Sequence, residues 1–320
     1  LLDRAEEAAQ AGVRAPKFAY EGVIDQTKKV LTGAPFDASD EPSALLADAY
    51  AKVDNLVEQE TIDAARGEEL KAAAKKALEG PFKEAFERIV SWHEAGLEEL
   101  GEPKGVWSLP DGEAYYNERL AFATTTDLTA DQIHEIGLQE VARLRAEMEA
   151  VRVRSGFEGD LAAYFEFARV DSSNFFPDTD EGRQGYIDGA TAHIDYIKEQ
   201  LPEYFGILPK ADLIVKRVEA FREQDGAAQH YFPGTPDGSR PGVYYAHLSD
   251  MTAMPKNQME VIAYHEGLPG HHMQISIAQE LEGVPQFRTQ AFYNAYAEGW
   301  ALYSELLAKE MGAYEDDMSE

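Results

Sequence analysis

Cysteine is absent from this chain of 320 residues. Its absence excludes disulfide bonds and thiolate metal ligands, so any metal site has to be built from histidine and carboxylate side chains. A chain without cysteine fits the reducing cytoplasm best. We therefore expect a cytoplasmic protein, with a secreted or periplasmic one as the alternative.

Long apolar runs and basic residues are also scarce. No run of about 18 or more apolar residues occurs, so we expect no membrane span. Only 29 lysine and arginine residues stand against 59 aspartate and glutamate residues, which gives a net charge of −30. Such a charge repels nucleic acid and anionic membranes. We expect the acidic surplus to be a solvated surface rather than a site for cationic substrates.

Helical patterns fill most of the chain and predict a mainly α fold. Apolar residues recur at helical spacing between 44 and 57, and Thr129 with Gln132 forms a capping box before a long helix to about 153. Further helices are expected at 68–78, 81–97, 160–168 and 181–201. We expect an N-terminal helical region over 1–110 and a second, catalytic helical region over 111–320, joined in one continuous fold. The chain starts at Leu1 without methionine and stops at Glu320, so we expect a fragment or a processed form.

The segment 212–250 departs from the helical pattern. Residues 212–221 and 242–248 are rich in β-branched and aromatic side chains, and a turn-rich loop separates them. We predict a small antiparallel sheet directly before the segment that carries the main motif.

That motif is the run YHEGLPGHHMQ over residues 264–274. A His-Glu pair followed by another histidine is typical of zinc hydrolases, but the usual spacing is His-Glu-x-x-His. Here His271 follows His265 by six residues, which turns its side chain about 120° away on a regular helix. His272 returns to the face of His265 but lies about 10.5 Å along the axis, too far to share one ion. A regular helix therefore cannot build a metal site from these residues.

The same run contains residues that break a helix. Pro269 has no N–H for the carbonyl of His265, and Gly267 and Gly270 relax the backbone on either side. A bulged or interrupted helix between the two glycines would turn His271 toward His265. We predict His265 and His271 as metal ligands, with His272 as the alternative to His271. A second His-Glu pair, at His93, has no histidine near it and is interpreted as a helix surface or a satisfied polar contact.

A carboxylate in an apolar helix supplies the third predicted ligand. Glu298 lies within 292–303, where nearly every neighbour is apolar or aromatic, and such a carboxylate is costly to bury unless it is paired or bound to a metal. Asn294 and Glu305 lie on the same side of that helix and are candidates to orient a ligand. A buried glutamate bonded to Tyr or Arg is the structural alternative.

These residues resemble the bacterial family called domain of unknown function 885, which carries a His-Glu-x-x-Pro-Gly-His-His-x-Gln stretch and a Glu-Gly-Trp-Ala-Leu-Tyr helix. Both stand here, at 265–274 and 298–303. The segments 124–138, 237–242 and 243–245 also resemble it. The family is similar to helical zinc peptidases with two histidine ligands and one glutamate, including Taq carboxypeptidases, angiotensin-converting enzyme, thimet oligopeptidase and dipeptidyl peptidase III. Several of these read Gly-His at the second ligand, which favours His271.

The sequence departs from the pattern of these peptidases at two points. Leu302 occupies the position where many relatives have an acidic residue to orient a histidine, and their transition-state-stabilising Tyr or His lies downstream of the ligand glutamate, where this chain ends.

The resemblance implies a Zn²⁺-dependent carboxypeptidase or oligopeptidase acting on short peptides, with Glu266 as the general base. A zinc amidase acting on a non-peptide amide and a non-catalytic zinc-stabilised binding protein are the alternatives. Three side chains near the predicted sheet are candidate substrate contacts. Arg240 could meet a substrate carboxylate, and Tyr244 or Tyr245 could donate a hydrogen bond to an oxyanion, although a loop-bracing arginine and a half-buried strand face explain the same residues.

Overall fold

A computed structural model describes residues 1–102 and 104–314. The chain divides into two compact units, Leu1–Tyr116 and Asn117–Glu320. The division falls a few residues beyond the boundary expected at 110. Helices dominate both units, so the predicted mainly α fold is confirmed. No helix in the described ranges has both the length and the apolar character that a membrane crossing requires.

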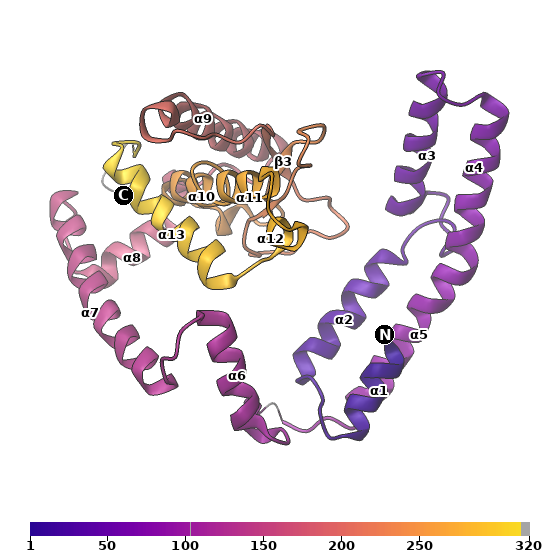
Figure 1. Cartoon of the computed structure of the whole chain (residues 1–320), viewed down its shortest axis with the longest axis horizontal. Helices are drawn as coiled ribbons and strands as arrows, with labels where there is room; N and C mark the ends of the chain where they lie inside the picture. The colour runs from indigo at the N-terminus through magenta and orange to yellow at the C-terminus, as the bar shows by residue number, and fades with distance from the viewer. Residues whose placement is uncertain (103, 315–320) are drawn as a thin grey trace. The chain divides into compact units, whose positions relative to one another are not determined.

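The first unit is built from paired helices (Figure 1). Its elements are α1 (Leu2–Gln10), α2 (Lys17–Val30), α3 (Ala44–Glu58), α4 (Ala64–Ala77), the π-helical turn η1 (Leu78–Phe82), α5 (Lys83–Leu97) and the 3₁₀ turn η2 (Val106–Ser108), and α6 (Gly112–Thr124) crosses into the second unit. Tyr20 on α2 stacks on Trp92 of α5 with ring centroids 5.7 Å apart. Gly96 allows this approach, because a Cβ there would lie 2.7 Å from the Tyr20 ring. His93 Nδ1 lies 2.8 Å from the carbonyl oxygen of Ile89, which is the satisfied polar contact expected.

Eight further elements carry the second unit's functional segments. They are α7 (Ala130–Arg154), α8 (Leu161–Val170), α9 (Asp180–Tyr204), α10 (Met259–Glu266), α11 (His271–Glu280), α12 (Gln286–Gln290), α13 (Asn294–Glu310) and a small sheet. The 3₁₀ turns η3 (Ser172–Asn174), η4 (Met251–Ala253) and η5 (Lys256–Gln258) lie between them. The predicted capping box of Thr129 and Gln132 is present at the start of α7.

Helix α10 lies between α9 and α13, and α11 continues roughly in line with it (Figure 1). Alpha-helical spacing explains the packing of α9, whose buried stripe is Tyr186, Ala190, Ile194, Ile197 and Leu201. On α13 the buried residues are all small, namely Ala297, Ala301, Ser304 and Ala308. Small side chains let the axes of two helices approach closely. Glu298 and Glu305, which flank this stripe, are therefore held near the end of α10.

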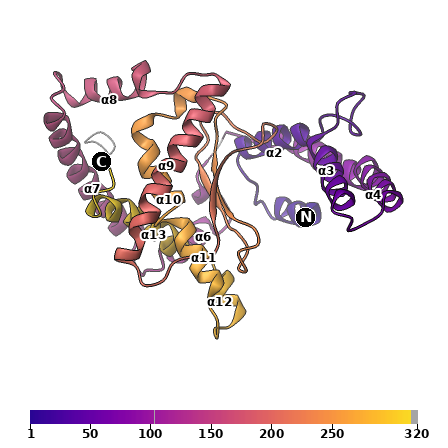
Figure 2. The same ribbon diagram turned by 90° about the horizontal axis from the view of Figure 1, so that it is seen from above.

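The sheet has the order β1–β3–β2, with β1 (Leu213–Arg217), β2 (His230–Phe232) and β3 (Gly242–Ala246), and lies beside α9 and α11 (Figure 2). Strand β2 is antiparallel to β3, but β1 is parallel to it. The prediction of an antiparallel sheet was therefore wrong in this respect. The long connection from 218 to 241 leaves room for the chain to return in its original direction, which a tight hairpin does not allow. It also contributes β2, which lies outside both strands expected from the sequence.

Candidate metal centre

The helix that begins at Met259 is interrupted between Gly267 and Gly270. Helix α10 ends at Glu266 and α11 begins at His271. The N–H of Gly270 bonds to the carbonyl of Tyr264, six residues back, and that of His272 bonds to the carbonyl of Gly267. A Cβ on Gly270 would lie 1.9 Å from the carbonyl oxygen of His265, so only glycine fits there. The interruption replaces the regular turn that would have directed His271 away from His265.

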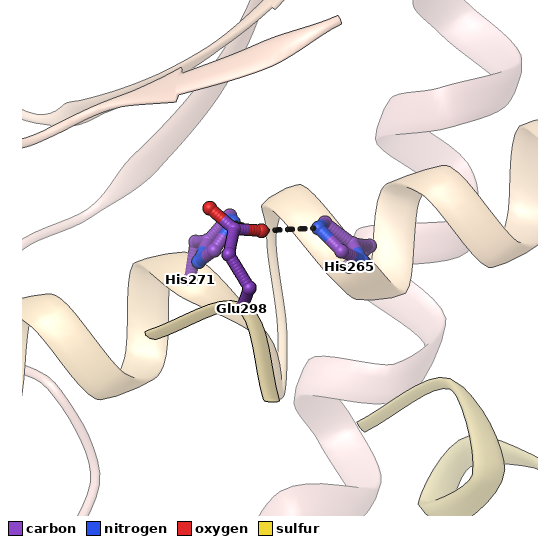
Figure 3. A group of neighbouring side chains, drawn as sticks. All are labelled: His265, His271 and Glu298. Atoms are coloured by element: carbon purple, nitrogen blue, oxygen red, sulfur yellow. Dashed lines mark ion pairs between the residues drawn. The ribbon is translucent and has the colours of Figure 1, made fainter. Parts of the chain in front are cut away.

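Three side chains from three helices converge at this interruption (Figure 3). Oε2 of Glu298 on α13 lies 3.6 Å from Nε2 of His265 and 3.4 Å from Nε2 of His271. The two imidazole rings are almost perpendicular, with centroids 4.8 Å apart. Among the described residues, these form the group of histidine and acidic side chains that could hold a metal ion, with one ligand atom each lying within 4.8 Å of the others.

The donor set fits zinc in type, and its two carboxylate–imidazole distances approach those of a zinc site. Two imidazoles and one carboxylate are a ligand set of catalytic zinc sites, which keep a fourth position open. Ligand distances of about 2.0–2.1 Å in a tetrahedron place neighbouring donors about 3.3–3.4 Å apart. The carboxylate–imidazole separations of 3.4 and 3.6 Å are close to that value. The side chain of Glu298 is 43% exposed, so solvent reaches the group.

Glu305 orients His265. Its Oε1 lies 2.7 Å from Nδ1 of His265, which leaves Nε2 of that ring directed at Glu298. Burial by itself lowers the pKa of His265, but Glu305 and the charges of Glu266 and Glu298 outweigh it and raise the pKa above its usual value. The acidic partner of His265 thus lies seven residues after Glu298, not at Leu302, the position expected from the resemblance. Asn294, the other candidate, is exposed at the start of α13.

Glu266 lies beside the group but has a different environment from Glu298. It is 8% exposed, and burial raises its pKa to about 7. The charge of His265 and a hydrogen bond from the backbone N–H of Tyr231 act in the opposite direction. A carboxyl group with a pKa near neutrality can both accept and return a proton, as a general base requires.

His271 and His272 face different surroundings. Burial and the charge of His265 lower the pKa of His271, and Glu298 partly offsets them. Its Nδ1 is buried and bonds to no described residue. His272 is 1% exposed, with Nε2 3.0 Å from the carbonyl oxygen of Ala211 and Nδ1 3.0 Å from the hydroxyl of Tyr231. Burial lowers its pKa to about 4. Both nitrogens of His272 are thus engaged away from Glu298, whereas Nε2 of His271 is directed at it.

The three candidate substrate contacts lie outside the group formed by His265, His271 and Glu298. Tyr244 is completely buried, and its hydroxyl lies 3.2 Å from that of Tyr186. Tyr245 stacks on His230 and lies under the guanidinium of Arg222. Successive residues of a strand point to opposite faces, which explains why these two tyrosines diverge.

The third candidate, Arg240, lies over the ring of Phe232 at 5.4 Å.

The sequence did not predict two contacts at the interruption between α10 and α11. Tyr231 approaches both Glu266 and His272, and Trp300 Nε1 donates to the carbonyl of Pro269 at 2.8 Å. Tyr231 belongs to no motif that the sequence offered, whereas Trp300 lies within the Glu-Gly-Trp stretch and could have been singled out.

Comparisons with known proteins identify the family of this chain. The model of the family described as "Bacterial protein of unknown function (DUF885)" matches residues 1–320. A solved structure described as "the putative lipoprotein from Colwellia psychrerythraea" is similar, with a TM-score of 0.87 and 28% sequence identity. The similarity covers 98% of this chain and 53% of that one, so this chain spans about half the length of the solved relative. No curated protein matches.

Proposed function

This chain belongs to the DUF885 family of bacterial proteins of unknown function, and we propose that it is a zinc-dependent hydrolase that cleaves peptide bonds in short peptides. The observation that carries the proposal is the convergence of His265, His271 and Glu298, whose ligand atoms lie within 4.8 Å of one another, with Glu298 3.6 and 3.4 Å from the two imidazoles. The buried Glu266 directly follows one of these ligands in the chain.

His265, His271 and Glu298 would hold the ion, and Glu305 would keep Nε2 of His265 pointing toward it. When bound, zinc supplies Lewis-acid polarisation of the scissile carbonyl and acidifies a water molecule. Glu266 accepts the proton of the attacking water and returns it to the leaving amine. A nearby cation favours the ionised carboxylate, so it counters the effect of burial on Glu266 and keeps it able to accept a proton.

Two features favour a catalytic centre over a zinc-stabilised binding module. Structural zinc sites are closed by four protein ligands, whereas the described group has three and an exposed carboxylate. Glu266 is also costly to bury and is not needed as a ligand. A non-peptide amide would be cleaved by the same groups, so the choice of substrate is decided by experiment.

The test combines metal analysis with a screen of short peptides whose C termini are free or blocked. We expect about one zinc ion per chain and hydrolysis that stops on chelation and returns with added zinc. Cleavage only of peptides with a free carboxylate would identify a carboxypeptidase. Protein that stays metal-free and gains no stability from zinc would contradict the proposal, and hydrolysis limited to non-peptide amides would identify the amidase.

Glu266→Gln separates catalysis from metal binding. Because Gln keeps the shape of the side chain but cannot take a proton, we expect zinc to stay bound while kcat falls by at least about 100-fold. Turnover is measured on the best peptide from the screen, with zinc content as the control. Near wild-type kcat in the folded, zinc-loaded variant would remove Glu266 as the base.

A further inference from the structure

His272 is held by hydrogen bonds to the sheet region. The carbonyl oxygen of Ala211, 3.0 Å from Nε2, can only accept, so Nε2 carries the proton and donates it. Nδ1 must then accept, and the hydroxyl of Tyr231 donates to it over 3.0 Å. Ser276 Oγ lies 3.4 Å from the same Nδ1, one turn along α11. Every polar atom of this buried imidazole therefore has a defined partner.

These bonds fix the first turn of α11. Ala211 lies just before β1, and Tyr231 lies in β2. Successive residues of a helix are separated by about 100° of rotation, so a fixed direction for His272 also fixes the direction of His271. The preceding interruption is held at another point, where Trp300 Nε1 donates to the carbonyl of Pro269. The imidazole of His272 adds the contact that sets the rotation of α11 against the sheet.

Tyr231 joins the sheet to α11. Its side-chain hydroxyl lies 3.0 Å from Nδ1 of His272 and 3.4 Å from Oγ of Ser276. Gly242 on β3 leaves the space for the pair, since a Cβ there would lie 2.6 Å from both His272 Nδ1 and the Tyr231 hydroxyl. One residue of β2 thus contacts two residues of α11.

We propose that Tyr231 and His272 form a positioning clamp that aims Nε2 of His271 at the metal, and that neither residue is a ligand. The inference rests on the proposed function for the identity of the metal. In this proposal His272 holds His271, the preceding residue, in the orientation that a ligand needs.

The experiment uses Tyr231→Phe and His272→Ala in the full chain, with two measurements. Zinc affinity is measured by competition with a chelator. Hydrogen exchange of the amides at 271–275 is measured by mass spectrometry on metal-free protein. We expect zinc affinity to fall about 10-fold, as is typical when a group that orients a ligand is lost. In Tyr231→Phe we expect exchange at 271–275 to rise by about 3- to 10-fold, because one buried hydrogen bond is lost, and in His272→Ala, which loses the bonds to both Ala211 and Tyr231, to rise further. His272→Asn retains a side-chain acceptor for Tyr231 and should restore part of both values.

Tyr186→Phe is the matched control. It removes a buried, hydrogen-bonded tyrosine hydroxyl that does not contact His272. If wild-type protein binds zinc, and Tyr231→Phe matches Tyr186→Phe in zinc affinity and in exchange at 271–275, the clamp is overturned while the proposed function stands. If wild-type protein binds no zinc but exchange rises only in the clamp variants, the zinc assignment fails and the clamp on His271 stands.

Discussion

At the scale of single residues, the distribution of partners decides what each histidine can do. His265 donates Nδ1–H to Glu305, and His272 uses both nitrogens in hydrogen bonds. In His265 and His271, Nε2 is directed at the carboxylate of Glu298. In His265 the bond from Nδ1 to Glu305 fixes the tautomer and directs Nε2, whereas Nδ1 of His271 has no partner among the described residues.

Glu305→Gln tests this orientation of His265. Gln can still contact the ring but carries no charge, so we expect zinc affinity to fall about 10- to 100-fold with little loss of stability. Affinity is measured by chelator competition and stability by urea unfolding. Glu310→Gln, an exposed position on the same helix, is the control. Equal affinities in the two variants would show that Glu305 does not orient the ligand.

A second buried carboxylate, Glu223, is held by an ion pair and a backbone hydrogen bond. Its side chain is 3% exposed and lies 2.7 Å from Arg217, and it also accepts the N–H of Leu248. Burial by itself raises the pKa of Glu223, but these two hydrogen bonds outweigh it and hold the pKa below its usual value of 4.5. The folded state therefore favours the ionised form.

The pH dependence follows from that direction. A lowered folded-state pKa stabilises the protein above the unfolded-state pKa, and the contribution is lost as pH falls through the folded-state value. Glu223→Gln should cost about 1–3 kcal/mol of the free energy of unfolding at pH 7, and the difference from wild type should shrink between pH 5 and 3. Urea unfolding across this range measures it. A difference that grows on acidification would contradict the assignment.

At the scale of elements, the interruption between α10 and α11 is what allows a lengthened motif to bring its side chains together. Pro269 and the two glycines made this visible in the sequence, because each disfavours a continuous helix for a known steric reason. The strand pairing of the sheet was harder to predict from the sequence. Its location was expected, but the parallel pairing of β1 with β3 depends on the path of residues 218–241, for which local composition gives no rule.

Gly270→Ala tests the interruption. The new Cβ would lie 1.9 Å from the carbonyl oxygen of His265, so the backbone must move and His271 with it. We expect a loss of several kcal/mol in the free energy of unfolding and a loss of zinc binding. Gly137→Ala on α7 has no atom within 4 Å of its new Cβ and should instead stabilise the helix by up to about 1 kcal/mol. Equal stabilities for the two variants would show that the close approach is not restrictive.

At the scale of the whole molecule, the charge of −30 is the dominant property. Like charges spread over a folded chain repel one another, and this repulsion is weaker in the expanded unfolded state. Salt shortens the Debye length from about 30 Å at 0.01 M to about 8 Å at 0.15 M, which screens most of the repulsion between surface charges.

We therefore expect Tm to rise as NaCl increases from 10 to 200 mM, at pH 7 and with the zinc content held constant. Circular dichroism at increasing temperature measures it. Sucrose at matched osmolality is the control, since it carries no charge. A Tm that falls over this range would mean that attractive ion pairs outweigh the net repulsion.

The sequence by itself determined the helical class, the absence of thiolate chemistry, the break at Pro269 and the residue types available to a metal. These follow from local properties, namely composition, helical period and backbone sterics. Tertiary structure decided that Glu305 orients His265, that His272 faces Ala211 and Tyr231, and that Tyr244 is sealed against Tyr186. These contacts join residues 40 to 61 positions apart in the chain, so they exist only after α9, α13 and the sheet have packed around α10 and α11.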